Sequence, residues 1–209
     1  YSFRKYIQAY PGWFKQEKKG LSKLLPTSKI EHIGSTAVPG LGGKGIIDIA
    51  ILTSKRFLET AKKKISSKGY EQWPVKKERK FFSFARYHKL KENPKKVFHI
   101  HITSDKDVFQ TMVLFREYLI KNPKVSQEYA KLKKKAVKLC KNQYGPYVKL
   151  KNPFIKAILK KAKKENMGEI KAVIFDIGGV LDTENYGNHY DMICEEIGLD
   201  KKQFFKSLI

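Results

Sequence analysis

The residues best suited to chemistry lie in one stretch, residues 32–41, which read His-Ile-Gly-Ser-Thr-Ala-Val-Pro-Gly-Leu. Gly34 has no Cβ, so the backbone there can approach a phosphate closely, and Ser35 adds a hydroxyl beside backbone amides. Asp48 follows Ser35 by thirteen residues inside an apolar run, where an ionised carboxylate is costly unless it meets a cation. This spacing favours a triphosphate site in which Asp48 holds Mg²⁺. The alternative is that Gly34-Ser35 is only a turn and that the Asp48 carboxylate accepts hydrogen bonds within the fold.

Two short predicted strands must position these residues. The first covers residues 29–33 and ends at the Gly-Ser corner, and the second covers residues 46–52 and carries Asp48. The second is almost wholly apolar, which is typical of a strand buried on both faces. The pattern also predicts helices at 11–25 and 55–67, strands at 81–87 and 97–103, and about three helices over 107–165 broken at Asn122-Pro123 and Gly145-Pro146. This order predicts an α+β domain, a small mixed sheet with a helical C-terminal layer.

The motif at residues 32–41, with Lys44 and Asp48 after it, resembles the signature of the GrpB family. The resemblance covers approximately residues 8–163 and continues through His99-Ile100-His101, Phe115-Arg116-Glu117-Tyr118-Leu119, Asn122-Pro123, Tyr147, Lys151 and Phe154-Ile155. That family is similar to the polymerase-β-like nucleotidyltransferase superfamily. The resemblance therefore implies a nucleotidyltransferase-like mixed sheet with C-terminal helices. It also implies a metal held by carboxylates and transfer of a nucleoside monophosphate from a nucleoside triphosphate to an acceptor, which it does not identify.

The resemblance also implies which residues meet the ligand. The phosphate-binding candidates are the corner of the motif and basic side chains at matching positions: Gly34, Ser35, Thr36, Lys44, Arg116 and Lys151. Basic side chains there would neutralise an anionic ligand. For Arg116 an ion pair with a nearby glutamate is the competing interpretation.

One departure from the superfamily pattern concerns the metal. The superfamily places a second carboxylate two residues after the first, and this chain has Ala50 there. Two-metal phosphoryl chemistry needs acidic ligands. His99 and His101 lie two apart and project to one strand face, so they are candidate metal ligands beside Asp48, with a purely structural role as the alternative. An active transferase and an inactive nucleotide-binding or regulatory domain both stay open.

The charge is unevenly distributed along the chain. Residues 1–168 carry 40 Lys and Arg against 12 Asp and Glu, whereas residues 169–209 carry 4 against 8. A boundary near residues 166–168 is therefore predicted. The basic excess makes an RNA-associated protein a further alternative. However, 39 of the 44 basic residues are lysine, and faces built for bidentate phosphate contacts use more arginine. A nucleotide or phosphorylated small molecule is the favoured partner.

A second motif begins after that boundary. Residues 171–181, Lys-Ala-Val-Ile-Phe-Asp-Ile-Gly-Gly-Val-Leu, resemble the first motif of haloacid-dehalogenase-like hydrolases. The resemblance makes Asp176 the nucleophile and a Mg²⁺ ligand, although Gly178 stands where phosphatases of that class have a second aspartate. We expect domains at 1–166 and 170–209. The second would be the first strand and cap helices of an incomplete Rossmann-like α/β hydrolase domain that cannot catalyse alone, or else merely a strand and turn.

The remaining features concern the cellular setting. No uncharged apolar run approaches the length of a membrane span, and the charged, aromatic start does not resemble a signal peptide. The chain does not begin with methionine, which suggests a fragment. The two cysteines, Cys140 and Cys194, are far apart, which argues against a disulfide scaffold or zinc site and for a reducing cytoplasm. The sequence predicts neither the oligomeric state nor the choice of metal.

Overall fold

The computed structural model describes residues 3–74, 80–88, 96–140 and 144–166. The chain divides into two units, Tyr1–Glu165 and Asn166–Ile209. Almost all of the second unit lies outside the described residues.

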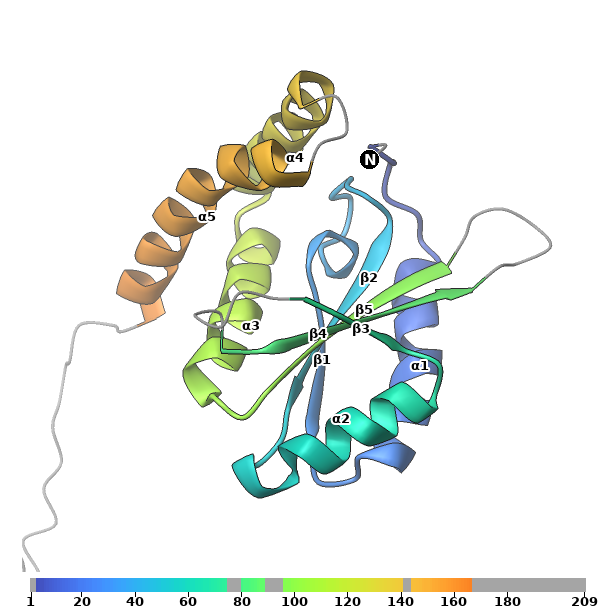
Figure 1. Ribbon diagram of the computed structural model, residues 1–209. Helices are drawn as coiled ribbons and strands as arrows, with labels where there is room; N and C mark the ends of the chain where they lie inside the picture. The colour runs from blue at the N-terminus through green and yellow to red at the C-terminus, as the bar shows by residue number, and fades with distance from the viewer. Residues whose placement is uncertain (1–2, 75–79, 89–95, 141–143, 167–209) are drawn as a thin grey trace, which may run out of the picture. The chain divides into compact units, whose positions relative to one another are not determined.

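Within the described residues, five strands form one mixed sheet in the order β1-β2-β5-β4-β3 (Figure 1). The strands are β1 (Lys29–Ile33), β2 (Ile46–Leu52), β3 (Glu71–Trp73), β4 (Phe82–His88) and β5 (Lys96–Thr103). β2 and β5 run parallel, while the other neighbouring pairs are antiparallel. The central position of β2 and β5 explains why their sequences are the most apolar of the sheet.

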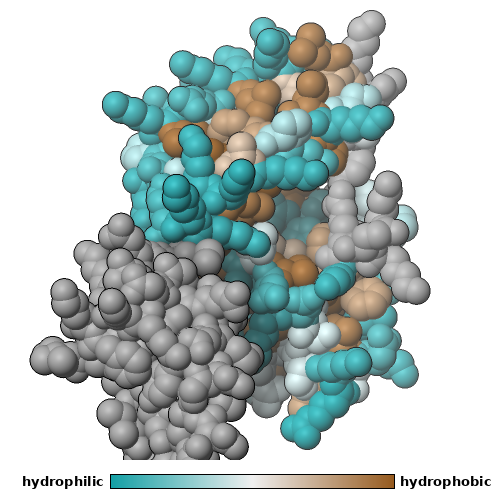
Figure 2. All heavy atoms as spheres, turned by 90° about the vertical axis from the view of Figure 1, so that its left-hand side faces the viewer, coloured by the Kyte–Doolittle hydropathy of each residue, from teal (hydrophilic) through white to brown (hydrophobic). Residues whose placement is uncertain are grey.

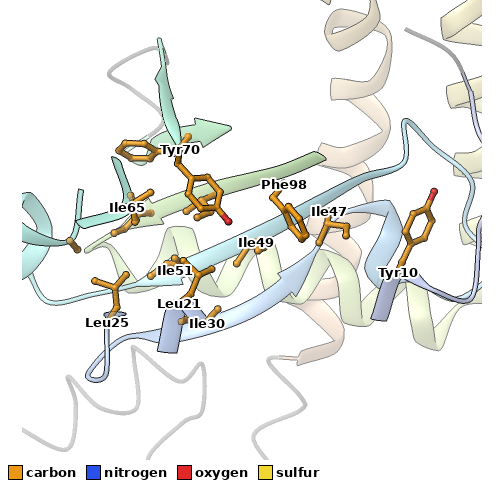
Figure 3. Packing of buried hydrophobic residues seen from close by; sticks show 14 residues of the cluster. Tyr10, Leu21, Leu25, Ile30, Ile47, Ile49, Ile51, Ile65, Tyr70 and Phe98 are labelled. Carbon is orange, nitrogen blue, oxygen red and sulfur yellow. The ribbon is translucent and has the colours of Figure 1, made fainter. Parts of the chain in front are cut away.

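One face of the sheet carries the main core, which is covered by α1 (Tyr10–Leu24) and α2 (Leu58–Ser67). Alternate residues of β2 point to this face and pair in register with alternate residues of β5: Ile47 with Phe98, Ile49 with Ile100, and Ile51 with Ile102. All six side chains are buried, and Figure 3 shows several of them packed against Leu21, Leu25 and Ile65. Burial of these branched side chains is the main favourable term for folding of this layer.

The opposite face of β1, β2 and β5 is covered by α3 (Lys106–Lys121). Asp105 caps this helix by accepting hydrogen bonds from the amides of Asp107 and Val108, which stabilises its first turn. α4 (Pro123–Leu139) and α5 (Tyr144–Asn166) complete the helical layer. A second apolar cluster joins this layer to the loop after β1, through the following residues: Val38, Leu41, Phe115, Leu119, Tyr129, Phe154 and Ile155.

The mixed sheet with C-terminal helices confirms the predicted α+β class for the first unit. The three helices expected over residues 107–165 are present as α3, α4 and α5, but one strand was not predicted and one helix break was misplaced. β3 was missed because Glu71, Gln72 and Trp73 are all exposed, so they show no buried alternation. Gly145-Pro146 lies in the first turn of α5 instead of breaking a helix, because proline is tolerated where the helix does not yet need its amide. Each helix within the described ranges is too short or too polar to span a bilayer.

Candidate functional site

The Gly-Ser corner directly adjoins Asp48. Ile33, the last residue of β1, pairs with Asp48 of β2, and Gly34 follows with φ +71° and ψ −167°, a conformation that only glycine adopts readily. A Cβ at Gly34 would collide with the Asp48 carboxylate. Ser35 then opens a short 3₁₀ turn, η1 (Ser35–Ala37). The absence of a Cβ at Gly34 therefore leaves room for the Asp48 carboxylate beside the Gly-Ser corner. This role adds to the one suggested by the sequence, which was close approach of the backbone to a phosphate.

Asp48 is flanked by the two histidines of β5. Its Oδ1 lies 3.8 Å from His99 Nδ1 and 3.6 Å from His101 Nε2, because the parallel register places Asp48 opposite His99 and Ala50 opposite His101. Burial tends to raise the pKa of Asp48, but the adjacent rings of His101 and His99, together with Lys151, lower it below its usual range. Its side chain is 27% exposed, so an ionised carboxylate faces the site.

These three side chains do not form the expected metal centre. Among the described residues no group of three His, Cys, Asp or Glu side chains is arranged to hold a metal ion. Each imidazole instead turns one nitrogen toward the same carboxylate oxygen, while His99 Nε2 and His101 Nδ1 are buried and have no hydrogen-bond partner in the part of the chain that the structure describes. Ala50, at the position of the missing second carboxylate, is fully buried with Ile33 and Phe109. That position is part of the apolar packing, so no second acidic ligand can come from it.

Lys133 of α4 is a site residue that the sequence analysis missed. Its side chain is only 2% exposed, and its ammonium donates to Ser35 Oγ at 2.7 Å and to the carbonyl of Gly42. The ammonium also lies 4.7 Å from the centre of the Tyr129 ring. Burial and repulsion from Lys151 lower the pKa of Lys133 to about 7, against the opposing effect of Asp48. A buried ammonium group therefore donates a hydrogen bond to the Ser35 hydroxyl.

A signal for Lys133 does exist in the sequence. The buried residues of α4 recur with helical spacing, and Lys133 falls among them instead of on the solvated face: Ser126, Tyr129, Lys133 and Ala136. A lysine on the apolar stripe of a helix needs a partner inside the fold. Lys133 was not predicted as a site residue because it belongs to the run Lys-Leu-Lys-Lys-Lys at residues 131–135, which is typical of a solvated stretch.

Lys44 and Lys151, predicted to bind phosphate, lie together over one aromatic ring. Their ammonium groups are 4.6 Å and 4.4 Å from the centre of the Tyr147 ring, a cation–π geometry. Burial and repulsion from Lys151 lower the pKa of Lys44 to about 8, while Asp48 acts in the opposite sense. Both lysines therefore lie within electrostatic reach of Asp48, although 103 residues separate Lys151 from it in sequence.

Thr36 has a structural role, in contrast to the expectation that it contacts phosphate. Its side chain is buried, and its hydroxyl donates to the carbonyl of Ile46 at 3.0 Å. That hydroxyl has only one proton, so His32 Nε2, 2.9 Å away, must be the donor in the second hydrogen bond. Burial lowers the pKa of His32 to about 4, which keeps the ring neutral. Thr36 therefore joins η1 to the start of β2.

Arg116 also has a structural role, which favours the ion-pair alternative. Its guanidinium donates to Glu31 Oε2 at 2.7 Å, to the carbonyl of His32 at 2.6 Å, and to Glu117. The side chain is 13% exposed. Although burial opposes it, hydrogen bonds to both glutamates raise the pKa of Arg116. These contacts tie α3 to β1 and use the donors that a phosphate would need.

Arg116→Met is accordingly expected to lower the free energy of unfolding by about 2 kcal/mol, because hydrogen bonds to charged groups are lost. Binding of phosphate ligands should change less than about twofold. Urea denaturation and calorimetry with inorganic tripolyphosphate measure the two effects, and Arg56→Met, outside this network, serves as the control. Lost binding with unchanged stability would restore Arg116 as a phosphate contact.

The sequence of the chain matches one known family over most of the first unit. The family model described as GrpB protein matches residues 2–161. The chain belongs to the GrpB family. The glutamate-rich protein GrpB of Alkalihalophilus pseudofirmus is 30% identical over 151 residues, which cover 70% of this chain and 86% of that protein. The protein YqkA of Bacillus subtilis is 28% identical over 171 residues, and this match spans 80% of this chain but only 48% of YqkA.

A solved structure supports the same assignment. The crystal structure of the conserved protein GrpB from Enterococcus faecalis aligns with a TM-score of 0.67 and 27% identity over 79% of this chain and 99% of that one. A structure of the Cid1 poly(U) polymerase aligns with a TM-score of 0.42 and 12% identity over 70% of this chain and 50% of that one. The likeness to Cid1 is too weak to indicate a ligand or an activity.

The predicted hydrolase segment of this GrpB-family chain has no counterpart in these findings. Asp176 and Cys194 lie outside the described residues, and the GrpB match ends at residue 161. The haloacid-dehalogenase-like fusion, including the role of Asp176, therefore stays a prediction. Cys140 is a free, buried cysteine.

The basic charge of the helical layer lies largely on its surface. The exposed lysines of α4 and α5 are the following: Lys124, Lys131, Lys134, Lys135, Lys138, Lys149, Lys156, Lys160, Lys161, Lys163 and Lys164. Figure 2 shows hydrophilic side chains over much of one face, interspersed with hydrophobic patches. Solvated helix faces explain this charge without a nucleic-acid partner. The RNA alternative stays a prediction, and steep loss of RNA affinity with rising salt would support it.

Proposed function

We propose that this GrpB-family domain binds a nucleotide or other phosphorylated small molecule by its phosphates at the corner formed by Gly34, Ser35 and Lys133. The observation that carries the proposal is the buried Lys133 ammonium, 2.7 Å from Ser35 Oγ. A buried cation is costly unless it is compensated. Among the described residues its two hydrogen-bond acceptors are neutral oxygens, the hydroxyl of Ser35 and the carbonyl of Gly42, so an anionic ligand would supply the missing charge.

The electrostatics of the described site favour an anion. Repulsion from Lys151 acts on both Lys44 and Lys133, and all three lysines interact electrostatically with a single carboxylate, Asp48. The pKa values of Lys44 and Lys133 are lowered to about 8 and about 7, as expected where positive charge exceeds negative charge in a partly dry environment. Phosphate oxygens would relieve this repulsion and accept charge-assisted hydrogen bonds.

Mg²⁺ fits this site if it binds together with the phosphates of the ligand. Mg²⁺ is commonly bound by one or two carboxylates together with substrate phosphates, and Asp48 supplies one ionised carboxylate. Imidazoles suit borderline transition metals better than Mg²⁺, so His99 and His101 are better interpreted as partners that position the carboxylate. When bound, Mg²⁺ would offset the repulsion between Asp48 and the phosphates.

Binding is the part of the function that these residues support best. Nucleotidyl transfer, implied by the family resemblance, is a second candidate because Asp48 is ionised beside the proposed phosphate position. Buried Ala50 removes the second acidic ligand, which favours a regulatory or binding role. Incubation with labelled nucleoside triphosphate and Mg²⁺ separates the two, since release of pyrophosphate occurs only on transfer.

The test of the proposed function uses Asp48→Asn. We expect the unmodified protein to bind ATP more tightly with Mg²⁺ than with EDTA. The variant should lose this difference but keep binding in EDTA, because the carboxylate that holds the cation and repels phosphate is gone. Calorimetry measures both, with Glu59→Gln as a control at an exposed carboxylate. The proposal fails if the unmodified protein binds neither ATP nor tripolyphosphate under either condition.

A further inference from the structure

The sheet face that carries Asp48 continues as a row of side chains toward the β3 edge. Residues directly opposite in neighbouring strands share a face, and the register pairs Ala50 with His101, His101 with Ser83, and Ser83 with Trp73. Asp48 and His99 occupy the same face two residues earlier. One continuous face therefore leads from the proposed phosphate position to Trp73.

Trp73 is the exposed end of this row. Its side chain belongs to the last strand of the sheet and is 45% exposed. Its ring nevertheless leans back over the sheet, with its centre 6.2 Å from that of His99 and an angle of 41° between the planes. His99 Nδ1 is in turn 3.8 Å from Asp48 Oδ1. His99 therefore lies between the exposed indole of Trp73 and the carboxylate of Asp48.

Folding does not account for this exposed indole. Glu71, Gln72 and Trp73 are all exposed, and β3 contributes nothing buried to the sheet. A large aromatic surface open to water beside a polar site is the arrangement that binds flat rings. Ser83 and the histidine rings lie along this row, whereas Lys44, Lys133 and Lys151 lie near Asp48 at the other end. A ligand that fits both ends carries its negative charge at one end and a flat ring at the other.

We propose that Trp73 is the stacking platform for the base of a nucleotide whose phosphates bind at Ser35 and Lys133. The substrate class is then a nucleoside polyphosphate, not an inorganic polyphosphate or a sugar phosphate. The inference rests on the proposed function for the phosphate end. Because any base has a π-face, stacking alone discriminates little between the four bases.

The experiment compares ATP with inorganic tripolyphosphate, which shares its phosphates but has no ring. Trp73→Ala is expected to weaken ATP binding about tenfold, the effect of one lost base–aromatic stack. Tripolyphosphate binding should change less than about twofold. Trp73→Phe should retain most of the ATP affinity, and Phe57→Ala, at a similarly exposed aromatic side chain outside the site, should change neither.

A fluorescence measurement reports on the platform directly. The chain has two tryptophans, so Trp13→Phe leaves Trp73 as the sole indole. ATP should quench its emission and tripolyphosphate should not. Equal affinities of ATP and tripolyphosphate, both insensitive to Trp73→Ala, would overturn the platform and leave the phosphate site intact. Failure of both probes to bind the unmodified protein would overturn the phosphate site and the platform together.

Discussion

Lys133→Met is expected to weaken tripolyphosphate binding at least about tenfold at pH 7 while leaving the domain as stable as before or more stable. The ammonium is buried against Ser35, and a hydrogen bond to a charged group in such a place contributes about 1.5–3 kcal/mol. Methionine keeps the length of the side chain and removes a buried charge, which is often neutral or stabilising. Calorimetry measures the affinity and urea denaturation the free energy of unfolding.

The matched control is Lys131→Met, at an exposed lysine of the same helix, which should change neither quantity. Tripolyphosphate affinity within twofold of the unmodified protein in Lys133→Met would show that this ammonium does not meet the ligand. A large loss of stability in that variant would show that Lys133 is primarily a structural residue.

Phosphate binding is also expected to depend on pH through Lys133. The charged form binds phosphate, so affinity should fall as pH rises past about 7, the pKa of Lys133, and past about 8, the pKa of Lys44. Binding near neutral pH should therefore take up protons, which calorimetry in two buffers of different ionisation enthalpy detects. Uptake that is equally large in Lys133→Met would assign the proton to another group.

The stability of the free domain should depend on pH in the opposite direction. Lys133 has a pKa of about 7 in the folded protein against 10.5 for a model lysine. Between these values the unfolded chain binds more protons, so the contribution of Lys133 to the free energy of unfolding rises with pH across this window. Below about pH 7 the full cost of burying the ammonium remains. Denaturation curves of Lys133→Met should show no corresponding rise in the free energy of unfolding over this pH range.

Gly34→Ala is expected to destabilise the domain by about 3 kcal/mol and to abolish phosphate binding. The φ of +71° and ψ of −167° fall in a region that costs a residue with a Cβ on the order of 1–3 kcal/mol, and the new methyl would also collide with Asp48. Relief of the collision would displace the carboxylate or the corner, and either change separates the parts of the site. Thermal and urea denaturation measure the loss.

Gly20→Ala is the control for this substitution, with an expected effect of opposite sign. Gly20 lies inside α1 with open space where its Cβ would be, so alanine there should stabilise the domain by about 1 kcal/mol. The double variant Gly34→Ala, Asp48→Ala should recover the part of the loss that comes from the collision, but not the part that comes from the backbone. Full recovery would show that φ strain contributes nothing.

Much of the fold followed from the sequence because it depends on local patterns. The almost wholly apolar sequence of β2 predicts its burial, and residues 29–33 and 46–52 were assigned to strands with the observed bounds. The closeness of Asp48 to the Gly-Ser corner was also predicted from the sequence. It holds because β1 and β2 are antiparallel neighbours joined by a single loop, so the end of one strand meets the start of the other.

Only the tertiary structure determined which side chains meet at the proposed phosphate position. Ser35 and Lys133 are 98 residues apart, and no local periodicity reports a contact at that separation. The structure likewise assigned Arg116 and Thr36 to packing, because their donors are used by Glu31 and by the carbonyl of Ile46. Residue type and spacing determine which groups can do chemistry, whereas the partners that the folded chain provides determine which of them are available.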